Sequence, residues 1–192
     1  CVVGNSHVYH LMHAFYALNL GHIFVWAPMR FPEDLITSDF FVTYRAKRGC
    51  TKFVIGAGQW AASWAAPEQY GSTMTFGRWY DAMLKVANHK ILGMEDGNVR
   101  LYLRTIHHNP LGDLISSCAN GRPQDWRSPT VIDGYNHVLE RIAAERNDTR
   151  VEFVDTTFIT FPVWDTGYDW CHLPPKVSMV EALYIAYRVL LK

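Results

Sequence analysis

The sequence lacks several features that mark broad classes of protein. No apolar run approaches the roughly 20 residues needed to cross a bilayer, so the chain holds no membrane span. Neither sign of charge dominates, because 18 Lys and Arg residues balance 18 Asp and Glu residues. No global field therefore draws the protein to nucleic acid or to an acidic membrane. The four cysteines include no Cys-x-x-Cys pair, which makes a zinc ribbon a poor interpretation.

Apolar residues, in contrast, are plentiful. Of the 192 residues, 49% are hydrophobic and 14% are aromatic, a composition that predicts a substantial core rather than disorder. No internal repeat and no linker divides the chain, so we expect one domain over residues 1–192. The first residues already have the character of a strand, and we expect the chain to be a fragment that lacks its native N-terminus.

The cysteines and one sequon bear on the cellular compartment. Cys1, Cys50, Cys118 and Cys171 are widely spaced. They could form two disulfides, remain buried thiols, or have partners in a missing N-terminal segment. Residues 147–149 (Asn-Asp-Thr) form an N-glycosylation sequon in a polar turn. The sequon favours the secretory pathway or the extracellular space, with the cytoplasm as the alternative.

Segments with strand and helix periodicity alternate along the chain, which predicts an α/β protein with a mostly parallel five-stranded sheet covered on both faces. Residues 30–50 are ambiguous: residues 32–34 resemble a turn, and residues 40–42 fit either a short edge segment or a helix. The expected strands are residues 2–3, 22–26, 52–56, 99–106 and 151–154, and the expected helices are residues 6–20, 76–87, 131–142 and 177–191.

Two short segments at opposite ends of the chain carry the residues of an acyl-transfer site. Residues 4–7 (Gly-Asn-Ser-His) end the first strand and open a helix, with Ser6 at the apex. Asp169 and His172 lie three positions apart on the loop before the last helix. A nucleophilic serine needs a base, and the base needs an acid that holds its tautomer. The carboxyl ends of parallel strands share one edge of a sheet, where these groups are expected to meet.

The chemistry assigns a role to each of these groups. Ser6 is the expected nucleophile, beside helix N–H groups that favour a developing oxyanion. His172 is the expected general base and then general acid, and Asp169 would orient it. Gln59 follows a glycine-containing turn at a strand end, so its amide is a candidate oxyanion donor. Such a mechanism needs no metal and no organic cofactor.

Each residue also has a simpler structural interpretation. A serine that opens a helix is commonly a cap. An Asp-x-x-His pair can be a loop hydrogen bond, and Gln59 alone could cap a strand end. Asp165, seven residues before His172, is a rival for the acid.

Further residues at this edge are candidates for substrate binding. Gly58 and Trp60 flank Gln59, and an exposed aromatic face suits a sugar ring. Arg104 either binds a polar substrate or braces the long loop of residues 107–129. We expect that loop and residues 28–50 to decide which substrate is taken.

Three histidines, His7, His10 and His13, recur at intervals of three on the first helix. That spacing could suggest a metal site. No carboxylate or cysteine accompanies them on that face, so we expect a surface or partly buried stripe rather than a metal site.

Together these blocks resemble the SGNH/GDSL hydrolase superfamily and, within it, the PC-esterase group. That group includes the trichome birefringence-like, Cas1p-type and neurexophilin-and-PC-esterase proteins. The resemblance spans nearly the whole chain in block order. Residues 3–7 are similar to the group's Gly-Asp-Ser block, and residues 55–60 are similar to a Gly-Gln-His block. The polar mid-domain loops of the group are similar to residues 104–105, 109–112 and 125–129. Residues 169–175 are similar to the closing Asp-x-x-His block.

The resemblance implies a flavodoxin-like three-layer α/β/α sandwich. It also implies a Ser-His-Asp acyl-enzyme mechanism on acylated glycans, with the acyl group passed to water by an esterase or to a sugar by an O-acetyltransferase. The partners would be an acylated carbohydrate and, for a transferase, an acetyl donor. Nucleic acid is not an expected partner.

Two departures from the group's pattern support an alternative. Asn5 stands where the group has Asp, and Gln59 with Trp60 replaces an Asn-containing oxyanion block. The alternative is a catalytically inactive glycan- or protein-binding module on the same scaffold. A flavodoxin-like domain for a phosphorylated ligand is a weaker rival, because residues 5–7 are too short for a phosphate-binding loop.

Overall fold

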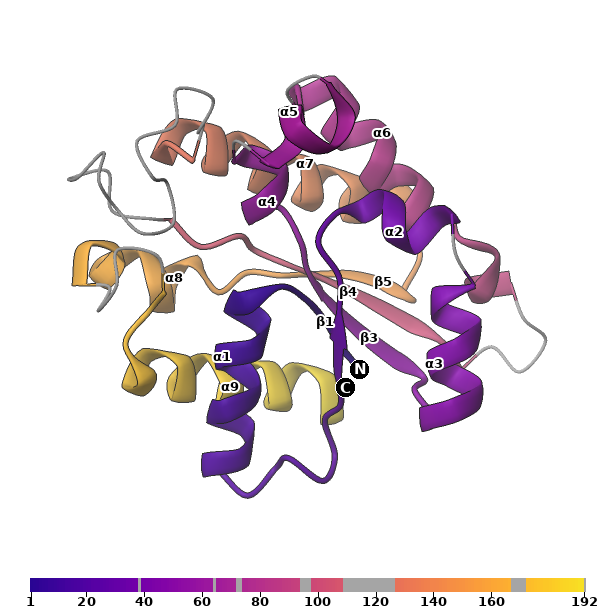
Figure 1. Ribbon diagram of the computed structural model, residues 1–192. Helices are drawn as coiled ribbons and strands as arrows, with labels where there is room; N and C mark the ends of the chain where they lie inside the picture. The colour runs from indigo at the N-terminus through magenta and orange to yellow at the C-terminus, as the bar shows by residue number, and fades with distance from the viewer. Residues whose placement is uncertain are drawn as a thin grey trace.

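A five-stranded parallel sheet forms the centre of the part of the chain that the computed structural model describes, residues 1–37, 39–63, 65–71, 74–93, 98–108, 127–166 and 172–191 (Figure 1). The strand order is β2-β1-β3-β4-β5, and every neighbouring pair is parallel. The strands are β1 (Val2–Gly4), β2 (Trp26–Pro28), β3 (Lys52–Gly56), β4 (Arg100–Arg104) and β5 (Val151–Val154). Their carboxyl ends therefore meet at one edge, where the chain enters α1 (Ser6–Ala17), α4 (Gln59–Ala62) and α8 (Thr157–Thr160).

Helices cover both faces of the sheet, which makes three layers (Figure 1). Helices α1 (Ser6–Ala17) and α9 (Pro175–Leu190) pack together on one face. The opposite face carries α2 (Pro32–Thr37), α3 (Phe40–Arg48), α6 (Phe76–Ala87) and α7 (Pro129–Arg146). Short helical turns complete the described elements: α4 (Gln59–Ala62), α5 (Ala65–Tyr70), η1 (Lys90–Gly93), α8 (Thr157–Thr160) and η2 (Phe161–Thr166).

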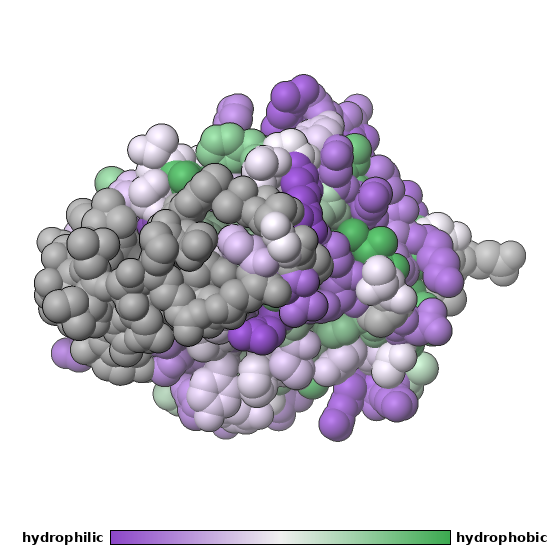
Figure 2. Space-filling view, turned by 45° about the horizontal axis from the view of Figure 1, so that its top comes forward, coloured by the Kyte–Doolittle hydropathy of each residue, from purple (hydrophilic) through white to green (hydrophobic). Residues whose placement is uncertain are grey.

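The strands have apolar side chains on both faces because both faces are covered. Successive side chains of a strand point to opposite sides. Val54 and Tyr102 face α1 and α9 on one side of the sheet. Phe53, Ile55 and Leu103 face α6 and α7 on the other side. All five side chains are almost fully buried. On the outside, the face in Figure 2 shows hydrophobic residues in small groups among hydrophilic ones.

Two glycines let the chain turn tightly at the carboxyl edge. Gly4 has a φ of +156°, and a Cβ there would lie 2.5 Å from the Val8 side chain and 2.7 Å from the Gly56 carbonyl oxygen. Gly58 has a φ of +125°, and a Cβ there would lie 2.1 Å from the Ile106 side chain. Any larger residue would clash in both turns. These turns start α1 and α4, the helices that carry Ser6 and Gln59.

A disulfide joins Cys1 to Cys50, which lies just before β3. The bond ties the N-terminal segment to the amino end of its neighbouring strand. The other two cysteines, Cys118 and Cys171, lie outside the described residues. Within the described ranges, no helix is both long enough and apolar enough to cross a membrane.

The expected α/β sandwich is confirmed, and β3, β5 and α6 have the predicted bounds. The predicted bounds of the second strand were wrong, because β2 covers Trp26–Pro28 rather than residues 22–26. The reason is packing, because the ring of Phe24 stacks on that of Phe15 with centroids 4.0 Å apart. The strand ladder with β1 then starts only at Trp26.

The expected turn at residues 32–34 was also wrong, because these residues open α2. Pro32 takes the first helical position, where its missing N–H costs nothing. Glu33 and Asp34 follow in the first turn, where a carboxylate is favoured by the helix dipole. Residues 40–42 belong to helix α3 and not to an edge segment.

Candidate active site

Ser6 occupies the first position of α1, directly after β1. The residue that caps this helix is Asn5, whose side-chain oxygen accepts a hydrogen bond from the N–H of His7 at 3.3 Å. Ser6 is partly exposed, and its hydroxyl makes no hydrogen bond to any residue that the structure describes. The interpretation of Ser6 as a helix cap is therefore wrong. Its hydroxyl lies beside the first turn of α1, where Asn5 accepts the N–H of His7 and the N–H groups of Ser6 and Val8 have no intrahelical acceptor.

His172 comes from the other end of the chain and lies against this same helix. Its ring centroid is 4.8 Å from that of His7 and 4.2 Å from that of His10. Positions four apart lie on one face of a helix, so a ring that contacts His10 lies beside the turn that carries Ser6. The structure thus brings together the predicted nucleophile segment and the predicted base.

The acid of the predicted triad has two candidates. Asp169 lies outside the described residues, and so does the side chain of Asp165. The choice between these two carboxylates stays a prediction.

Gly58, Gln59 and Trp60 lie at the carboxyl end of β3, as expected. Gly58 caps α4, and the side-chain amide of Gln59 is buried and donates a hydrogen bond to the carbonyl oxygen of His107. One N–H of that amide therefore holds the segment after β4, and its role towards an oxyanion stays a prediction. Trp60 is half-buried, with the guanidinium of Arg30 4.3 Å from its ring centroid.

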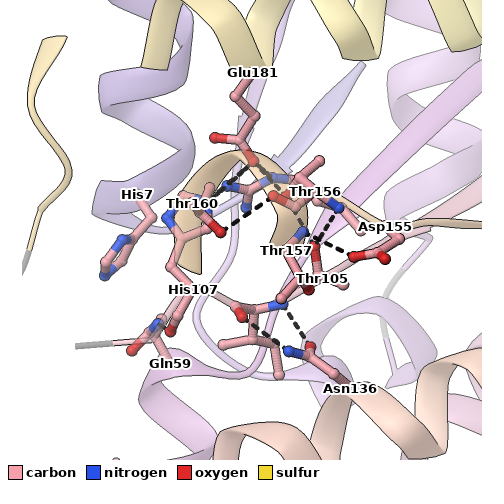
Figure 3. A network of polar contacts seen from close by, with 12 residues as sticks. His7, Gln59, Thr105, His107, Asn136, Asp155, Thr156, Thr157, Thr160 and Glu181 are labelled. Carbon is pink, nitrogen blue, oxygen red and sulfur yellow. Dashed lines mark hydrogen bonds and ion pairs between the residues drawn. The ribbon is translucent and has the colours of Figure 1, made fainter. Parts of the chain in front are cut away.

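Arg104 forms a buried ion pair with Glu181 beneath the site. Figure 3 labels Glu181 together with its neighbours His107 and Thr156. Nε and Nη2 of Arg104 both lie 2.7 Å from one carboxylate oxygen of Glu181, and the two side chains are 2% and 1% exposed. Nε2 of His107 lies 3.0 Å from the same oxygen, and Thr156 donates its hydroxyl to it at 2.9 Å. The contacts observed for Arg104 are therefore structural. A direct contact between Arg104 and substrate stays a prediction.

Burial and nearby charge shift the pKa values of three groups in this region. Burial raises the pKa of Glu181, but Arg104 and His107 lower it more, so the net value lies well below the ordinary range. Burial is the largest cause that lowers the pKa of His7, followed by the charges of His107 and His172. Burial also lowers the pKa of His107, and Arg104 adds to that effect. His7 and His107 are therefore neutral at neutral pH.

These shifts predict a loss of stability in mild acid. The ordinary pKa of 6.5 is lowered for His7 in the fold, so below about pH 6.5 the unfolded chain binds more protons than the folded protein. The free energy of unfolding should then fall by up to about 1.4 kcal/mol per pH unit for each such histidine. Urea unfolding at about pH 7.5 and about pH 5.5 measures this fall.

His7→Gln should make the pH dependence shallower, whereas His137→Gln is the control, since His137 is 77% exposed on α7. An unchanged pH dependence in His7→Gln would contradict the assignment.

A cavity of about 560 Å³ opens beside Ser6 on the side away from His172. At about 100° per residue, Tyr9 and His10 lie on either side of Ser6, one turn further along α1. Tyr9 faces the cavity and His10 contacts His172, so Ser6 lies between the two. The cavity is lined by Gly4, Asn5, Ser6, Tyr9, Trp26, Pro28, Met29, Arg30 and Asp34.

Two parts of this region were not predicted from the sequence. Glu181 and His107 were not assigned a role, although a lone carboxylate on the buried face of an apolar helix was a usable signal. Tyr9 and Trp26 were missed as lining residues because their contact joins a helix to a strand and depends on tertiary packing. Arg30 falls within residues 28–50, where substrate specificity was expected.

The three histidines of α1 differ in their exposure to solvent. His7 is buried, His10 is partly buried, and His13 is exposed against the ring of Tyr9, 4.5 Å away between centroids. Within the described part of the chain, no group of three or more His, Cys, Asp or Glu side chains is arranged to hold a metal ion.

No protein-family model matches this sequence, and no curated protein matches it either. Solved structures do match it in fold. An acetyl xylan esterase, AlAXEase, has a TM-score of 0.59 at 13% identity, over 98% of this chain and 99% of that one. A Bacteroides fragilis protein proposed to be an acylhydrolase has a TM-score of 0.66 at 14% identity, over 97% of this chain and 84% of that one.

A mutant of Axe2, an acetylxylan esterase from Geobacillus stearothermophilus, has a TM-score of 0.61 at 14% identity, over 100% of this chain and 93% of that one. At such identities these likenesses show the fold alone. The chain therefore has the three-layer α/β fold found in these carbohydrate esterases.

Proposed function

We propose that this chain is a serine-dependent esterase that removes acyl groups, acetyl above all, from acylated carbohydrates. One observation carries the proposal: the ring of His172 lies against His7 and His10, on the helix that Ser6 begins. A nucleophile and a base from opposite ends of the chain thus meet at the carboxyl edge of a parallel sheet, where such sheets place their reactive groups.

The mechanism follows from these positions. His172 takes the proton of the Ser6 hydroxyl as its oxygen attacks the ester carbonyl, and the N–H groups of the first turn of α1 stabilise the oxyanion. The tetrahedral intermediate collapses, and His172 gives the proton to the departing sugar oxygen. Water then attacks the acyl-enzyme in the same way, which releases the acid and restores Ser6. Asp169 is the proposed partner of the His172 ring.

The structural neighbours support the choice of Asp169. The solved structures of Axe2 include catalytic mutants in which a serine, an aspartate or a histidine is replaced by alanine. In that protein the aspartate and the histidine are three positions apart. Asp169 and His172 have the same spacing, whereas Asp165 does not.

The finer assignments belong to the same proposal. Water as acceptor gives an esterase and a sugar hydroxyl gives an O-acetyltransferase, and the names of the structural neighbours favour the esterase. Membership of the PC-esterase group stays a prediction. We place the protein in the secretory pathway or outside the cell, supported by the Cys1–Cys50 disulfide and by the exposed sequon at Asn147.

The second candidate, an inactive binding module, had two departures in its favour. The first departure, Asn5 in place of Asp, is weak support for an inactive module, because Asn5 still accepts the capping hydrogen bond that an aspartate would accept. The second departure, at Gln59, keeps an amide at the end of β3.

The test is acetate release by the purified chain from 4-nitrophenyl acetate and from acetylated xylo-oligosaccharides. We expect turnover of both substrates, and inhibition by a sulfonyl fluoride that reacts with activated serine. Rates equal to the buffer blank on both substrates would reject the esterase in favour of the binding module.

A further inference from the structure

We infer that the cavity beside Ser6 selects acylated sugars that carry a negative charge, and that Arg30 is the residue that recognises the anion. This inference rests on the proposed function, since it names the substrate class of the same site. It is carried by the lining of the cavity, by the position of the Arg30 guanidinium, and by the charges nearby.

The cavity has an aromatic wall fixed to the strand that presents Ser6. Trp26 is 36% exposed, and its ring nitrogen donates a hydrogen bond to the carbonyl oxygen of Gly4 at 3.0 Å. The ring of Tyr9 lies beside it, with centroids 5.0 Å apart. Large, rigid rings of this kind offer flat apolar area to the C–H face of a sugar. The wall would hold the sugar whose ester oxygen is cleaved.

Arg30 supplies the positive charge of the cavity. Its side chain is exposed, and it forms no ion pair with any residue in the described ranges. The ring of Trp60, 4.3 Å from the guanidinium carbon, holds the group by a cation–π contact. A guanidinium presents its N–H donors in one plane, where a carboxylate can accept two of them.

The acidic residue in the lining, Asp34, does not cancel this charge by direct contact. One of its carboxylate oxygens accepts hydrogen bonds from the backbone N–H groups of Arg30, at 3.3 Å, and Phe31, at 3.1 Å. Asp34 therefore holds the loop that carries Arg30. Among the lining residues, Arg30 supplies the positive charge that attracts an anionic substrate.

A carboxylate-bearing sugar of the uronic acid type has the required chemistry. A sulfated sugar offers the same charge, so the test uses both. Wild-type kcat/KM is measured on three acetylated methyl glycosides: a neutral glucoside, its glucuronate counterpart and its sulfated counterpart. A charge-assisted hydrogen bond is worth about 1.5–3 kcal/mol, which predicts about a 10- to 100-fold preference for an anionic sugar. A larger preference for the glucuronate identifies the carboxylate, and one for the sulfated sugar identifies sulfate.

Arg30→Gln removes the charge but keeps a polar side chain, so the ratio of anionic to neutral kcat/KM should fall towards one. Arg141→Gln is the matched control, because Arg141 is exposed on α7 and pairs with Glu145 outside the cavity. That variant should keep the wild-type ratio. Equal rates on all three sugars in the wild type would overturn the inference, and so would an Arg30→Gln ratio equal to that of the wild type.

The failure of this inference can be told from the failure of the proposed function. Hydrolysis of 4-nitrophenyl acetate without any sugar preference would overturn the inference and leave the esterase intact. If no ester is hydrolysed, calorimetric titration with methyl glucuronoside and methyl glucoside tests the cavity directly. Binding of the glucuronoside that is lost in Arg30→Gln supports the inference. Equal binding of the two sugars, or none, overturns it.

Discussion

Replacement of Ser6 by alanine is expected to lower kcat/KM on 4-nitrophenyl acetate by about 10⁴-fold or more, because it removes the hydroxyl that accepts the acyl group in the proposed mechanism. The folded state should be unaffected. Asn5 rather than Ser6 caps α1, and the Ser6 hydroxyl makes no hydrogen bond to any described residue. Ester hydrolysis and urea unfolding of the same preparation measure the two effects.

The matched control is Ser128→Ala. Ser128 also stands at a helix start, but it is a true cap: its hydroxyl accepts a hydrogen bond from the N–H of Val131 at 3.4 Å. Loss of a cap costs about 1 kcal/mol of stability. Ser128→Ala should therefore lose stability and keep activity, the reverse of Ser6→Ala. A Ser6→Ala protein that keeps its activity, or that is destabilised as a cap variant would be, contradicts the account.

Glu181→Gln is expected to lower the free energy of unfolding by about 3–5 kcal/mol, the usual cost of removing one partner of a buried ion pair. The variant keeps the shape of the side chain but leaves the guanidinium of Arg104, 2% exposed, without its counter-charge. His107 and Thr156 lose a charged acceptor in the same step. Chemical unfolding near neutral pH measures the effect.

The comparison variant is Glu145→Gln, which breaks the pair between Glu145 and Arg141. That pair joins positions four apart on α7, and its side chains are 47% and 59% exposed. Exposed pairs of this kind are worth about 0.3–0.5 kcal/mol. Similar losses of unfolding free energy in Glu181→Gln and Glu145→Gln would contradict the larger stabilisation that we assign to the buried pair.

Much of the fold could be predicted from the sequence because apolar periodicity is a local property. Residues 52–56 and 151–154 are short segments rich in Val, Ile and Phe, and they form β3 and β5 as expected. The predicted bounds of the second strand were wrong because Phe24 has strand character but packs on Phe15. That tertiary contact is not contained in any local sequence pattern. The prediction for residues 32–34 was wrong because Pro32 was interpreted as a turn residue rather than as the start of helix α2.

The site was predictable to the extent that topology dictated it. Ser6 and His172 could be paired because parallel strands deliver their carboxyl ends to one edge. The pairing of Arg104 with Glu181 could not be predicted, because it joins a strand to a helix distant in sequence and depends on how α9 is rotated. The same holds for Arg30 and Trp60, whose contact depends on the path of the chain after β2.

The proposed mechanism depends on an acyl-enzyme that forms on Ser6. This intermediate can be trapped by mixing the protein rapidly with 4-nitrophenyl acetate and quenching in acid, and the acetylated peptides can be mapped by mass spectrometry. We expect one acetyl group on the peptide that contains Ser6, and none there in Ser6→Ala. Turnover with the acetyl group on another residue, or with no acetylated peptide at all, would contradict it.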